Sequence, residues 1–457
     1  MERIVIVGGG ISGLATAYYL LQKRPDIELL VLEAEKRPGG KVWTERTEGF
    51  ICEAGVNGFL DNKQGTISLA RLLGLEPLRS SDSARKRAVY INGTLKWIPD
   101  TPPKIFLSSF LSLRARLRML GEYFVPKKEL EDETIESFVT RRVGREFFEK
   151  LLDPMVTGIY AGDPSKLSIK SCFPKVYELE KRYGGLIKGF IKLQKERKRQ
   201  GGKVEAGPGG VLHSFKNGMF TIIEILKDRL GERVKTDSPV TGIERIGNLY
   251  KIHCTGGATY ETPCIVIATP AHNSSQILRE LNPSLSALLK DIPYPPLSVV
   301  ALGFRKEDIK ADTDYFGFLV AGKEKGRILG CLFDSSIFPG RAPEGHILLR
   351  CMIGGARAPE LAMLDDEELI KLALEELDRI TGIKGSPVYK RIFRYDKAIP
   401  QYVLGHSRRL EDIEKELSRT KGLYLTGNAY YGVAMNDCIQ QGALLAERIV
   451  SDSERKS

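Results

Sequence analysis

The stretch Arg3-Ile-Val-Ile-Val-Gly-Gly-Gly-Ile-Ser-Gly13 decides the fold, because an apolar run leads directly into a glycine cluster. The cluster has the form Gly-x-Gly-x-x-Gly, and residues 13–23 then carry apolar side chains at helical spacing. A second apolar run, residues 29–32, ends in Glu33. The pattern predicts a strand, a helix and a second, parallel strand.

Each part of this unit has a reason in dinucleotide binding. Gly8 permits a tight turn, Gly10 lets the backbone approach a pyrophosphate, and Gly13 allows close packing of helix on strand. Glu33, twenty residues beyond Gly13, is placed to accept ribose hydroxyls. The same predicted site includes the neighbouring residues Ile11, Ser12 and Ala34. The alternative is a glycine-rich turn that binds nothing.

Two further segments favour FAD over NAD. Arg37, Gly40 and Lys41 follow the acid closely and place a second glycine turn and two cations beside the expected pyrophosphate. Near the other end, residues 426–437 precede a predicted helix whose first amides could stabilise negative charge on a reduced flavin. Read alone, that loop could also be an ordinary helix cap.

Length and composition describe a folded chain of two to four domains, or one large fold with an inserted lobe. The chain has 457 residues, of which 42% are hydrophobic and 28% charged. Its start lacks the pattern of a signal peptide, and the run 105–113 is too short to span a bilayer. The seven cysteines never form Cys-x-x-Cys, which fits a reducing cytoplasm.

The net charge of +11 is concentrated in two segments. Residues 85–118 hold eight Lys or Arg against one Asp, and residues 175–203 hold ten against three acids. Such segments indicate an anionic partner, which could be nucleic acid, an acidic lipid surface or a charged substrate. The five histidines show no grouping typical of metal ligands, so no metal is expected, and no catalytic acid or base stands out.

The remaining chain alternates between helical and strand-like patterns. Residues 97–200 are rich in Leu, Arg, Glu and Lys at helical spacing, whereas residues 291–400 contain several strand-like runs. A last strand at 423–427 and a helix from about 436 complete the chain.

Together these segments resemble the FAD-dependent superfamily of amine oxidases, carotenoid desaturases and protoporphyrinogen oxidases. Within it, the chain is most similar to the protoporphyrinogen oxidase family. The specific stretches are GIYAGDPSKLSIKSCFP at 158–174 and GVAMNDCIQQG at 432–442. The resemblance implies FAD-dependent oxidation of protoporphyrinogen IX, or in some bacteria coproporphyrinogen III, to the porphyrin of haem biosynthesis. Six electrons leave in three flavin cycles, usually to oxygen, and no protein nucleophile is required.

The resemblance also implies roles for individual residues. Arg87 matches an arginine that pairs with a substrate propionate. Other positions match residues that surround the macrocycle, namely Gly158, Phe316, Leu319, Leu332 and Met352. Further matches lie around the cofactor: Val240 beside adenine, the loop residues Gly55, Val56 and Asn57, and the C-terminal residues Gly427, Asn428, Val433, Ala434 and Met435. Taken singly, the apolar positions could equally be core residues.

The fold expected from pattern and resemblance is α/β, with a discontinuous Rossmann-like FAD-binding domain, a β-rich substrate domain and an inserted helical lobe that faces a membrane. The FAD domain is predicted from 1–75, 205–290 and 415–457, and the substrate domain from 76–96 and 291–414. The lobe spans 97–204, and its basic segments are expected to meet anionic lipid on the cytoplasmic face of the membrane. The resemblance also allows a homodimer.

Two other functions remain open. An amine oxidase on the same fold often carries a lysine near flavin N5, and the stretch 291–305 contains none. A non-enzymatic flavoprotein could use the basic lobe to bind RNA, but the basic segments lack the interleaved aromatic residues of single-strand platforms apart from Tyr177 and Tyr183, so nucleic acid is not expected.

Overall fold

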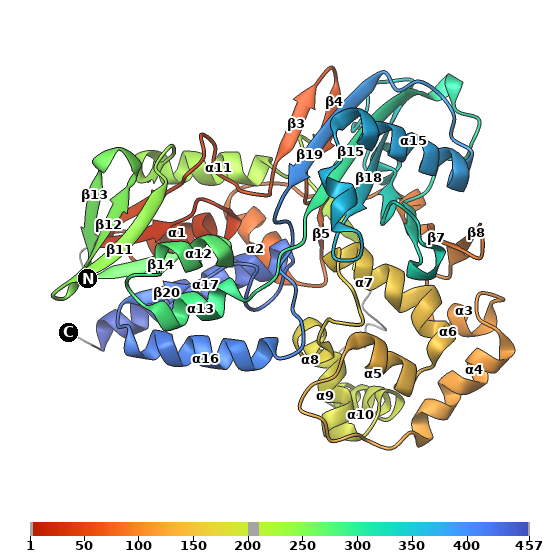
Figure 1. Cartoon of the computed structure of the whole chain (residues 1–457), viewed down its shortest axis with the longest axis horizontal. Helices are drawn as coiled ribbons and strands as arrows, with labels where there is room; N and C mark the ends of the chain where they lie inside the picture. Colours follow the sequence, from red (N-terminus) through yellow and green to blue (C-terminus); the bar gives the residue numbers. More distant parts are fainter. Residues whose placement is uncertain (1–2, 200–209, 456–457) are drawn as a thin grey trace.

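The computed structural model describes residues 3–199 and 210–455 in three parts (Figure 1). The first part contains a five-stranded parallel sheet with strand order β10-β2-β1-β14-β20. Its strands are β1 (Arg3–Val7), β2 (Glu28–Leu32), β10 (Val234–Lys235), β14 (Cys264–Ile267) and β20 (Leu423–Leu425). This sheet confirms the predicted α/β class with a Rossmann-like core.

Both faces of this sheet are covered, which explains the uninterrupted apolar run of β1. Ile4 and Ile6 belong to a core shared with α1 (Ile11–Lys23), α11 (Thr221–Leu230) and α17 (Met435–Glu454). Val5 and Val7 point to the opposite core. That core is completed by α12 (Ala271–Ile277), α13 (Pro283–Lys290), α16 (His406–Arg419), β11 (Val240–Ile246), β12 (Leu249–Cys254) and β13 (Thr259–Thr262).

The second part is a seven-stranded sheet with order β19-β15-β18-β17-β16-β7-β8, in which only the pair β16 and β7 is parallel among the described strands. One face packs against α15 (Asp366–Thr381), whose start carries a capping box between Asp365 and Glu368. The strands are β7 (Arg87–Ile91), β8 (Thr94–Ile98), β15 (Leu297–Arg305), β16 (Gly317–Val320), β17 (Gly330–Leu332), β18 (His346–Gly354) and β19 (Tyr389–Tyr395).

The third part is the helical lobe. A buried ion pair between Arg142 and Glu122, with N and O 2.5 Å apart, joins α5 (Ile135–Arg142) to the turn that follows α4 (Leu113–Leu120). None of the described helices has the length and apolar character needed to cross a membrane. The helices are α3 (Pro102–Leu107), α4 (Leu113–Leu120), α5 (Ile135–Arg142), α6 (Arg145–Phe147), α7 (Asp153–Tyr160), α8 (Ile169–Cys172), α9 (Pro174–Tyr183) and α10 (Leu186–Arg199).

Short elements connect the three parts. A hairpin from the first part packs its Phe50 and Cys52 on the seven-stranded sheet. These elements are β3 (Thr44–Thr47), β4 (Phe50–Glu53), β5 (Phe59–Leu60), β6 (Leu78–Arg79), β9 (Leu212–Ser214), α2 (Gln64–Leu72) and α14 (Asp334–Ile337).

The predicted domain limits differ from the structure at two places. β8 continues to Ile98, past the expected limit at 96, because it pairs along its whole length with β7. The limit at 414 falls inside α16, whose Ile413 and Leu417 pack in the core of the parallel sheet. The limit at 204 lies outside the described residues.

Candidate functional site

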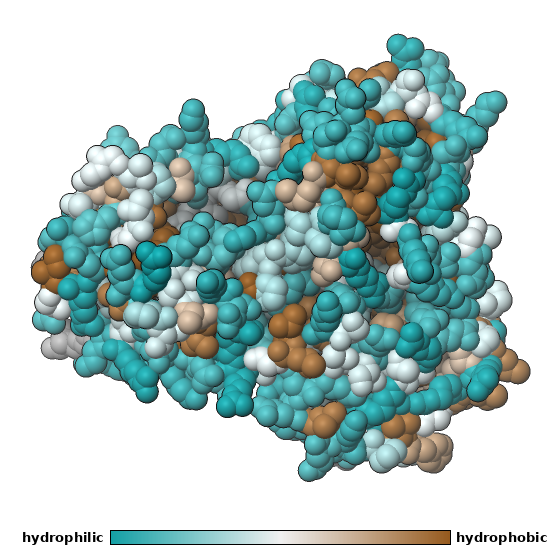
Figure 2. Space-filling view, viewed as in Figure 1, coloured by the Kyte–Doolittle hydropathy of each residue, from teal (hydrophilic) through white to brown (hydrophobic). Residues whose placement is uncertain are grey.

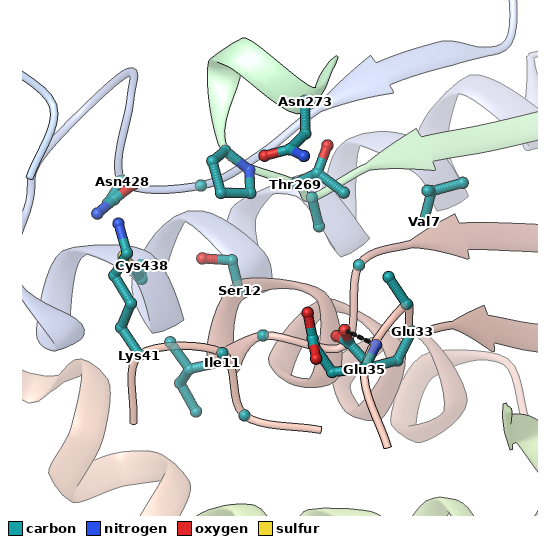
Figure 3. Close-up of a pocket in the computed structure, with 18 of the residues that line it drawn as sticks. Val7, Ile11, Ser12, Glu33, Glu35, Lys41, Thr269, Asn273, Asn428 and Cys438 are labelled. Atoms are coloured by element: carbon teal, nitrogen blue, oxygen red, sulfur yellow. Dashed lines mark hydrogen bonds between the residues drawn. The ribbon is translucent and has the colours of Figure 1, made fainter. Parts of the chain in front are cut away.

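A cavity of about 420 Å³ lies where the strands of the parallel sheet end at their carboxyl side. This is the edge at which open α/β sheets bind their ligands. Glu33 and Glu35 lie at one end of the cavity, Lys41 and Asn428 at the other, and Ser12 between them (Figure 3). Fourteen of the predicted cofactor residues line it: Gly8, Gly10, Ile11, Ser12, Glu33, Ala34, Gly40, Lys41, Val56, Val240, Gly427, Asn428, Val433 and Met435.

Two glycines of the first turn are required by their surroundings. Gly8 has φ +110°, a conformation that side chains disfavour. A Cβ on Gly13 would lie 2.0 Å from the carbonyl oxygen of Gly8, so no larger residue fits there. Gly13 therefore does not line the cavity but holds α1 against β1. At Gly10 a Cβ would meet no described atom within 4 Å, so this backbone is open to a ligand.

Glu33 stands at the carboxyl end of β2 with its carboxylate held by backbone amides. Oε2 accepts a hydrogen bond from the amide of Gly9 at 2.7 Å, and Oε1 accepts one from the amide of Glu35 at 2.9 Å. A Cβ on Gly9 would lie 2.9 Å from Oε2, so a glycine is needed for this contact at a position where the motif allows any residue. The carboxylate is thus fixed at the cavity wall, as a ribose acceptor must be.

Lys41 brings a cation to the other end of the cavity. Its Nζ donates to the carbonyl oxygens of Lys397, at 2.8 Å, and Ala398. Burial lowers the pKa of this ammonium to about 8. An anionic group in the cavity would oppose that shift, so Lys41 suits an anionic group of a bound dinucleotide.

Arg37 takes a different place from the predicted one. Its guanidinium lies over the Trp43 ring, 4.3 Å from the centroid, and Nη1 donates to the carbonyl oxygen of Gly40 at 3.3 Å. Burial lowers its pKa. Arg37 therefore shapes the second glycine turn from outside the cavity.

Three other predicted cofactor residues also lie beside the cavity without lining it. Ala434 is the N-cap of α17, between two residues that do line the cavity. Gly55 is needed for close packing, because a Cβ there would lie 2.8 Å from the carbonyl oxygen of Lys41. Asn57 accepts a hydrogen bond from Arg350 at 2.7 Å through Oδ1, while its buried Nδ2 has no hydrogen-bond partner among the described residues. That amide group is free to donate to a ligand.

The predicted substrate residues of the sheet share one face. Leu319 pairs with Gly330, and Gly330 pairs with Met352, so the three positions lie in one row across the strands. Leu332 lies two residues beyond Gly330 on the same strand and therefore points to the same face. Arg87 belongs to the same face through the pairing of Val89 with Leu319. The alternate residues, such as Cys331 and Cys351, point into the core under α15.

This face looks toward the cofactor part. Arg350, which pairs with Leu332, donates to the backbone oxygen of Glu53 at 2.6 Å as well as to Asn57. Gly158 of α7 lies over Leu319, where an added Cβ would lie 2.8 Å from Cδ2. The residues implied by the resemblance thus meet between the sheet, α7 and the cofactor part.

Arg87 is exposed at the end of this face. Its guanidinium stacks over the ring of Phe316, 4.7 Å from the centroid. Phe316 packs on the other side with the small core around Ile337 and Phe338. The stacked guanidinium keeps its donors free for an anion.

Sequence reasoning missed about half of the cavity wall. The loop after β14 contributes Thr269 and Pro270, and α12 contributes Asn273. A signal was available, because the apolar run at 264–267 is typical of a buried strand whose carboxyl end would face the same edge as that of β1. The other missed residues are Val7, Leu32, Glu35, Gly39, Val42, Ser238, Pro239, Ala268, Ile277 and Cys438.

Four features of the cavity and its surroundings fit FAD: an open glycine backbone, a fixed carboxylate, a half-buried ammonium and an unpartnered amide donor. The model of the flavin-containing amine oxidoreductase family matches residues 11–450. Coproporphyrinogen III oxidase of Bacillus subtilis is 32% identical over 96% of both chains, and chloroplastic protoporphyrinogen oxidase 1 of Arabidopsis thaliana is 33% identical over 95% of this chain and 86% of its own. A solved structure from Exiguobacterium sp. 255-15, named for protoporphyrinogen oxidase, superposes with a TM-score of 0.82 at 26% identity, over 98% of each chain. The chain belongs to the flavin-containing amine oxidoreductases, within the branch of the porphyrinogen oxidases, and is an FAD-dependent oxidoreductase.

Proposed function

We propose that the enzyme oxidises protoporphyrinogen IX to protoporphyrin IX in haem biosynthesis. The observation that carries this proposal is the sheet face of Leu319, Leu332 and Met352, which looks toward the cofactor part and ends in the stacked cation Arg87. A flat, largely apolar macrocycle with propionates at one edge matches an apolar face with a cation at its rim.

The residues of this face bind and orient the substrate. FAD, held by Glu33, Lys41 and the glycine turn, would supply the acceptor for a hydride from a methylene bridge of the macrocycle. Three such oxidations would remove three hydrides from methylene bridges and three protons, two from pyrrole nitrogens and one from the fourth bridge by tautomerisation. Six electrons leave in all, and dioxygen, reduced to hydrogen peroxide, is the proposed acceptor in each round. Arg87 holds a propionate while the apolar side chains exclude water, and this chemistry requires no protein nucleophile.

Coproporphyrinogen III is the second candidate substrate, because the Bacillus subtilis relative is named for it. It carries four propionates where protoporphyrinogen IX carries two, so it would draw on more cations than Arg87 at the rim of the face. The amine oxidase alternative gains no support from the relatives reported above.

The two substrates are separated by anaerobic reduction of the holoenzyme with each porphyrinogen, followed by readmission of oxygen. Bleaching of the flavin absorbance by protoporphyrinogen IX, and then appearance of porphyrin, is the expected result. Bleaching by coproporphyrinogen III alone would transfer the proposal to that substrate. If neither porphyrinogen bleached the flavin, the proposed activity would be wrong.

We further propose that the helical lobe rests on an acidic membrane at its cytoplasmic face. On α4, Leu113, Leu117 and Leu120 are 69%, 60% and 54% exposed at a spacing that places them on one side of the helix. Phe124, in the following turn, is 81% exposed. Hydrophobic side chains at the outer edge of the lobe are visible in Figure 2. Such a surface suits the boundary between headgroups and acyl chains.

The basic residues of α4 have two different roles: one is exposed, and two make hydrogen bonds within the lobe. Arg114 is exposed, as a lipid-binding residue should be. Arg116 donates to the carbonyl oxygen of Leu111 at 3.0 Å, and Arg118 to that of Arg142 at 3.1 Å, so both hold the lobe together. From the sequence alone, the whole basic segment 85–118 is expected to meet anionic lipid.

Sedimentation with vesicles of anionic and of neutral lipid at low salt tests the membrane proposal. The double variant Leu113→Glu/Leu117→Glu should lose binding to anionic vesicles, whereas Ile246→Glu, an equally exposed site on β11, should not. Failure of the unaltered protein to sediment with anionic vesicles would refute the proposal. A homodimer stays a prediction.

A further inference from the structure

The segment 396–405, between β19 and α16, joins all three parts of the molecule. The carbonyl oxygens of its residues Lys397 and Ala398 accept hydrogen bonds from Lys41 of the cofactor part. Gln401 donates through Nε2 to the carbonyl oxygen of Tyr160 in the lobe at 2.8 Å, and the amide of Ser168 donates to the carbonyl oxygen of Tyr402 at 2.8 Å. The segment is therefore held from two sides.

Tyr402 uses this support to brace a loop of the cofactor site. Its hydroxyl donates to the carbonyl oxygen of Asn428 at 2.6 Å and accepts from the amide of Gly432 at 3.0 Å. The side chain is 1% exposed, and its ring stacks on His406 with 4.2 Å between centroids and 11° between planes. Burial raises the pKa of this hydroxyl well above its usual value, so it stays neutral and able both to donate and to accept.

The middle of the braced loop is held by side chains, because Ala429 and Tyr430 pack in the core of the parallel sheet and the Tyr431 hydroxyl donates to Glu414 at 3.1 Å. Gly427 and Gly432 stand at its two ends with φ of +134° and +132°. Glycine adopts many backbone conformations, so the two ends are the points at which the loop can shift. The hydroxyl of Tyr402 links the backbone of Asn428, which follows the first glycine, to the backbone of Gly432.

The same loop leads into the first turn of α17 at the cavity. Asn428 lies at the end of the cavity opposite Glu33 (Figure 3), and Val433 and Met435, which follow it along the chain, also line the cavity. Because Glu33 suits the adenosine ribose and the glycine turn suits the pyrophosphate, the flavin half of the cofactor belongs at this end. The first amides of α17 have no partners within the helix and carry partial positive charge.

We propose that Tyr402 is a positioning residue, which holds loop 427–432 so that the first turn of α17 stays against the flavin, and which thereby sets both FAD affinity and flavin potential. The proposal rests on FAD and not on the identity of the porphyrinogen. Negative charge gained on reduction would be stabilised by the helix amides only while the loop keeps them in place.

Tyr402→Phe is the direct test, because it removes the hydroxyl and keeps the ring that stacks on His406. Tyr160→Phe is the matched control: this ring is 5% exposed and contacts Tyr402, but its hydroxyl donates to the carbonyl oxygen of Cys172 at 3.2 Å, away from the cofactor loop. For each protein we would measure the dissociation constant of FAD, the midpoint potential of the bound flavin against a reference dye, and the melting temperature of the apoprotein.

Tyr402→Phe is expected to weaken FAD binding about tenfold, as the loss of a pair of buried hydrogen bonds implies. Reduced FAD should lose about tenfold more affinity than oxidised FAD, which for a two-electron couple lowers the midpoint potential by about 30 mV. Tyr160→Phe should leave the potential unchanged. Porphyrinogen preference enters neither measurement, so the proposed substrate can fail without affecting this test.

Two results would overturn the proposal. In the first, Tyr402→Phe binds FAD with the parent affinity and potential. In the second, FAD affinity and apoprotein melting temperature fall together while the potential is unchanged, which would show that Tyr402 contributes only general stability.

Discussion

Glu33 illustrates how single residues shape the cofactor site. Its carboxylate is held by two backbone amides, of Gly9 and Glu35, and is turned to the cavity wall. Its position therefore depends on the glycine cluster as much as on its own side chain.

Replacing Glu33 by Ala should weaken FAD binding, because charge-assisted hydrogen bonds to the ribose are worth about 1.5 to 3 kcal/mol, or roughly ten- to hundredfold in the dissociation constant. Titration of the apoprotein with FAD measures this. Glu28→Ala is a suitable control, since Glu28 lies on the same strand but pairs with Arg3 at the surface. FAD binding as tight in Glu33→Ala as in Glu28→Ala would remove Glu33 from the site.

Arg87→Ala should raise the KM for the porphyrinogen about tenfold, the effect of losing one charge-assisted contact, with little change in flavin content. Steady-state kinetics and the flavin-to-protein absorbance ratio give both quantities. Arg85→Ala removes a charge two residues away whose guanidinium pairs with Asp82, 3.6 Å distant, and should leave KM unchanged. Equal KM values for the two variants would contradict the propionate role.

Helix α16 begins with an unusual residue for its surroundings. His406 is fully buried, neither ring nitrogen makes a well-aligned hydrogen bond to a described residue, and Arg409 and the backbone of Ala429 and Tyr430 lie nearby. Burial, reinforced by the Arg409 charge and partly opposed by the backbone of Tyr430 and Ala429, lowers its pKa to about 4. The first residue of α16, which follows the 396–405 segment, is therefore a histidine with a neutral imidazole.

Between pH 4 and pH 6.5 the unfolded chain binds a proton at position 406 that the folded protein excludes, so stability should rise with pH over this window. The shift from an ordinary value near 6.5 to about 4 corresponds to about 3 kcal/mol at most. His406→Phe keeps a ring against Tyr402 and should flatten this part of the profile. Urea unfolding of both proteins at several pH values measures it, and parallel profiles would contradict the expectation.

At the scale of the whole molecule, a buried charge cluster joins the cofactor and substrate parts. Arg350 and Asp334, each 1% exposed, form a two-pronged ion pair, and Arg350 also reaches Glu53 and Asn57 across the boundary. Burial raises the pKa of Glu53 to about 7, against the opposing effect of Arg341. The boundary between the cofactor and substrate parts is therefore held by paired, buried charges.

Asp334→Ala should leave Arg350 buried without its counter-charge and cost about 3 to 5 kcal/mol of folding stability. Thermal and urea unfolding measure the loss. Asp366→Ala, which removes an exposed partner of Arg394, should have little effect. Similar losses in both variants would show that the buried pair is no more important than a surface pair.

How much the sequence could predict depends on the range of the interactions involved. The first strand, helix and acid follow from adjacent residues, and their places match the pattern closely. Strand β10, of two residues, has too few side chains to show a period, and it exists because it pairs with β2. Proximity in sequence places Arg37 beside the expected pyrophosphate, whereas in the structure its guanidinium stacks on the ring of Trp43.

The sequence by itself determined the dinucleotide turn and favoured FAD as cofactor, because these features lie in contiguous residues whose spacing reflects local backbone geometry. The family followed from the resemblance carried by the stretches 158–174 and 432–442. Only the tertiary structure decided that Asn57 is turned by Arg350, that Thr269 and Asn273 complete the cavity, and that Tyr402 braces the loop before α17. These contacts join segments far apart along the chain. They are formed by packing and buried hydrogen bonds, which leave no periodic trace in the sequence.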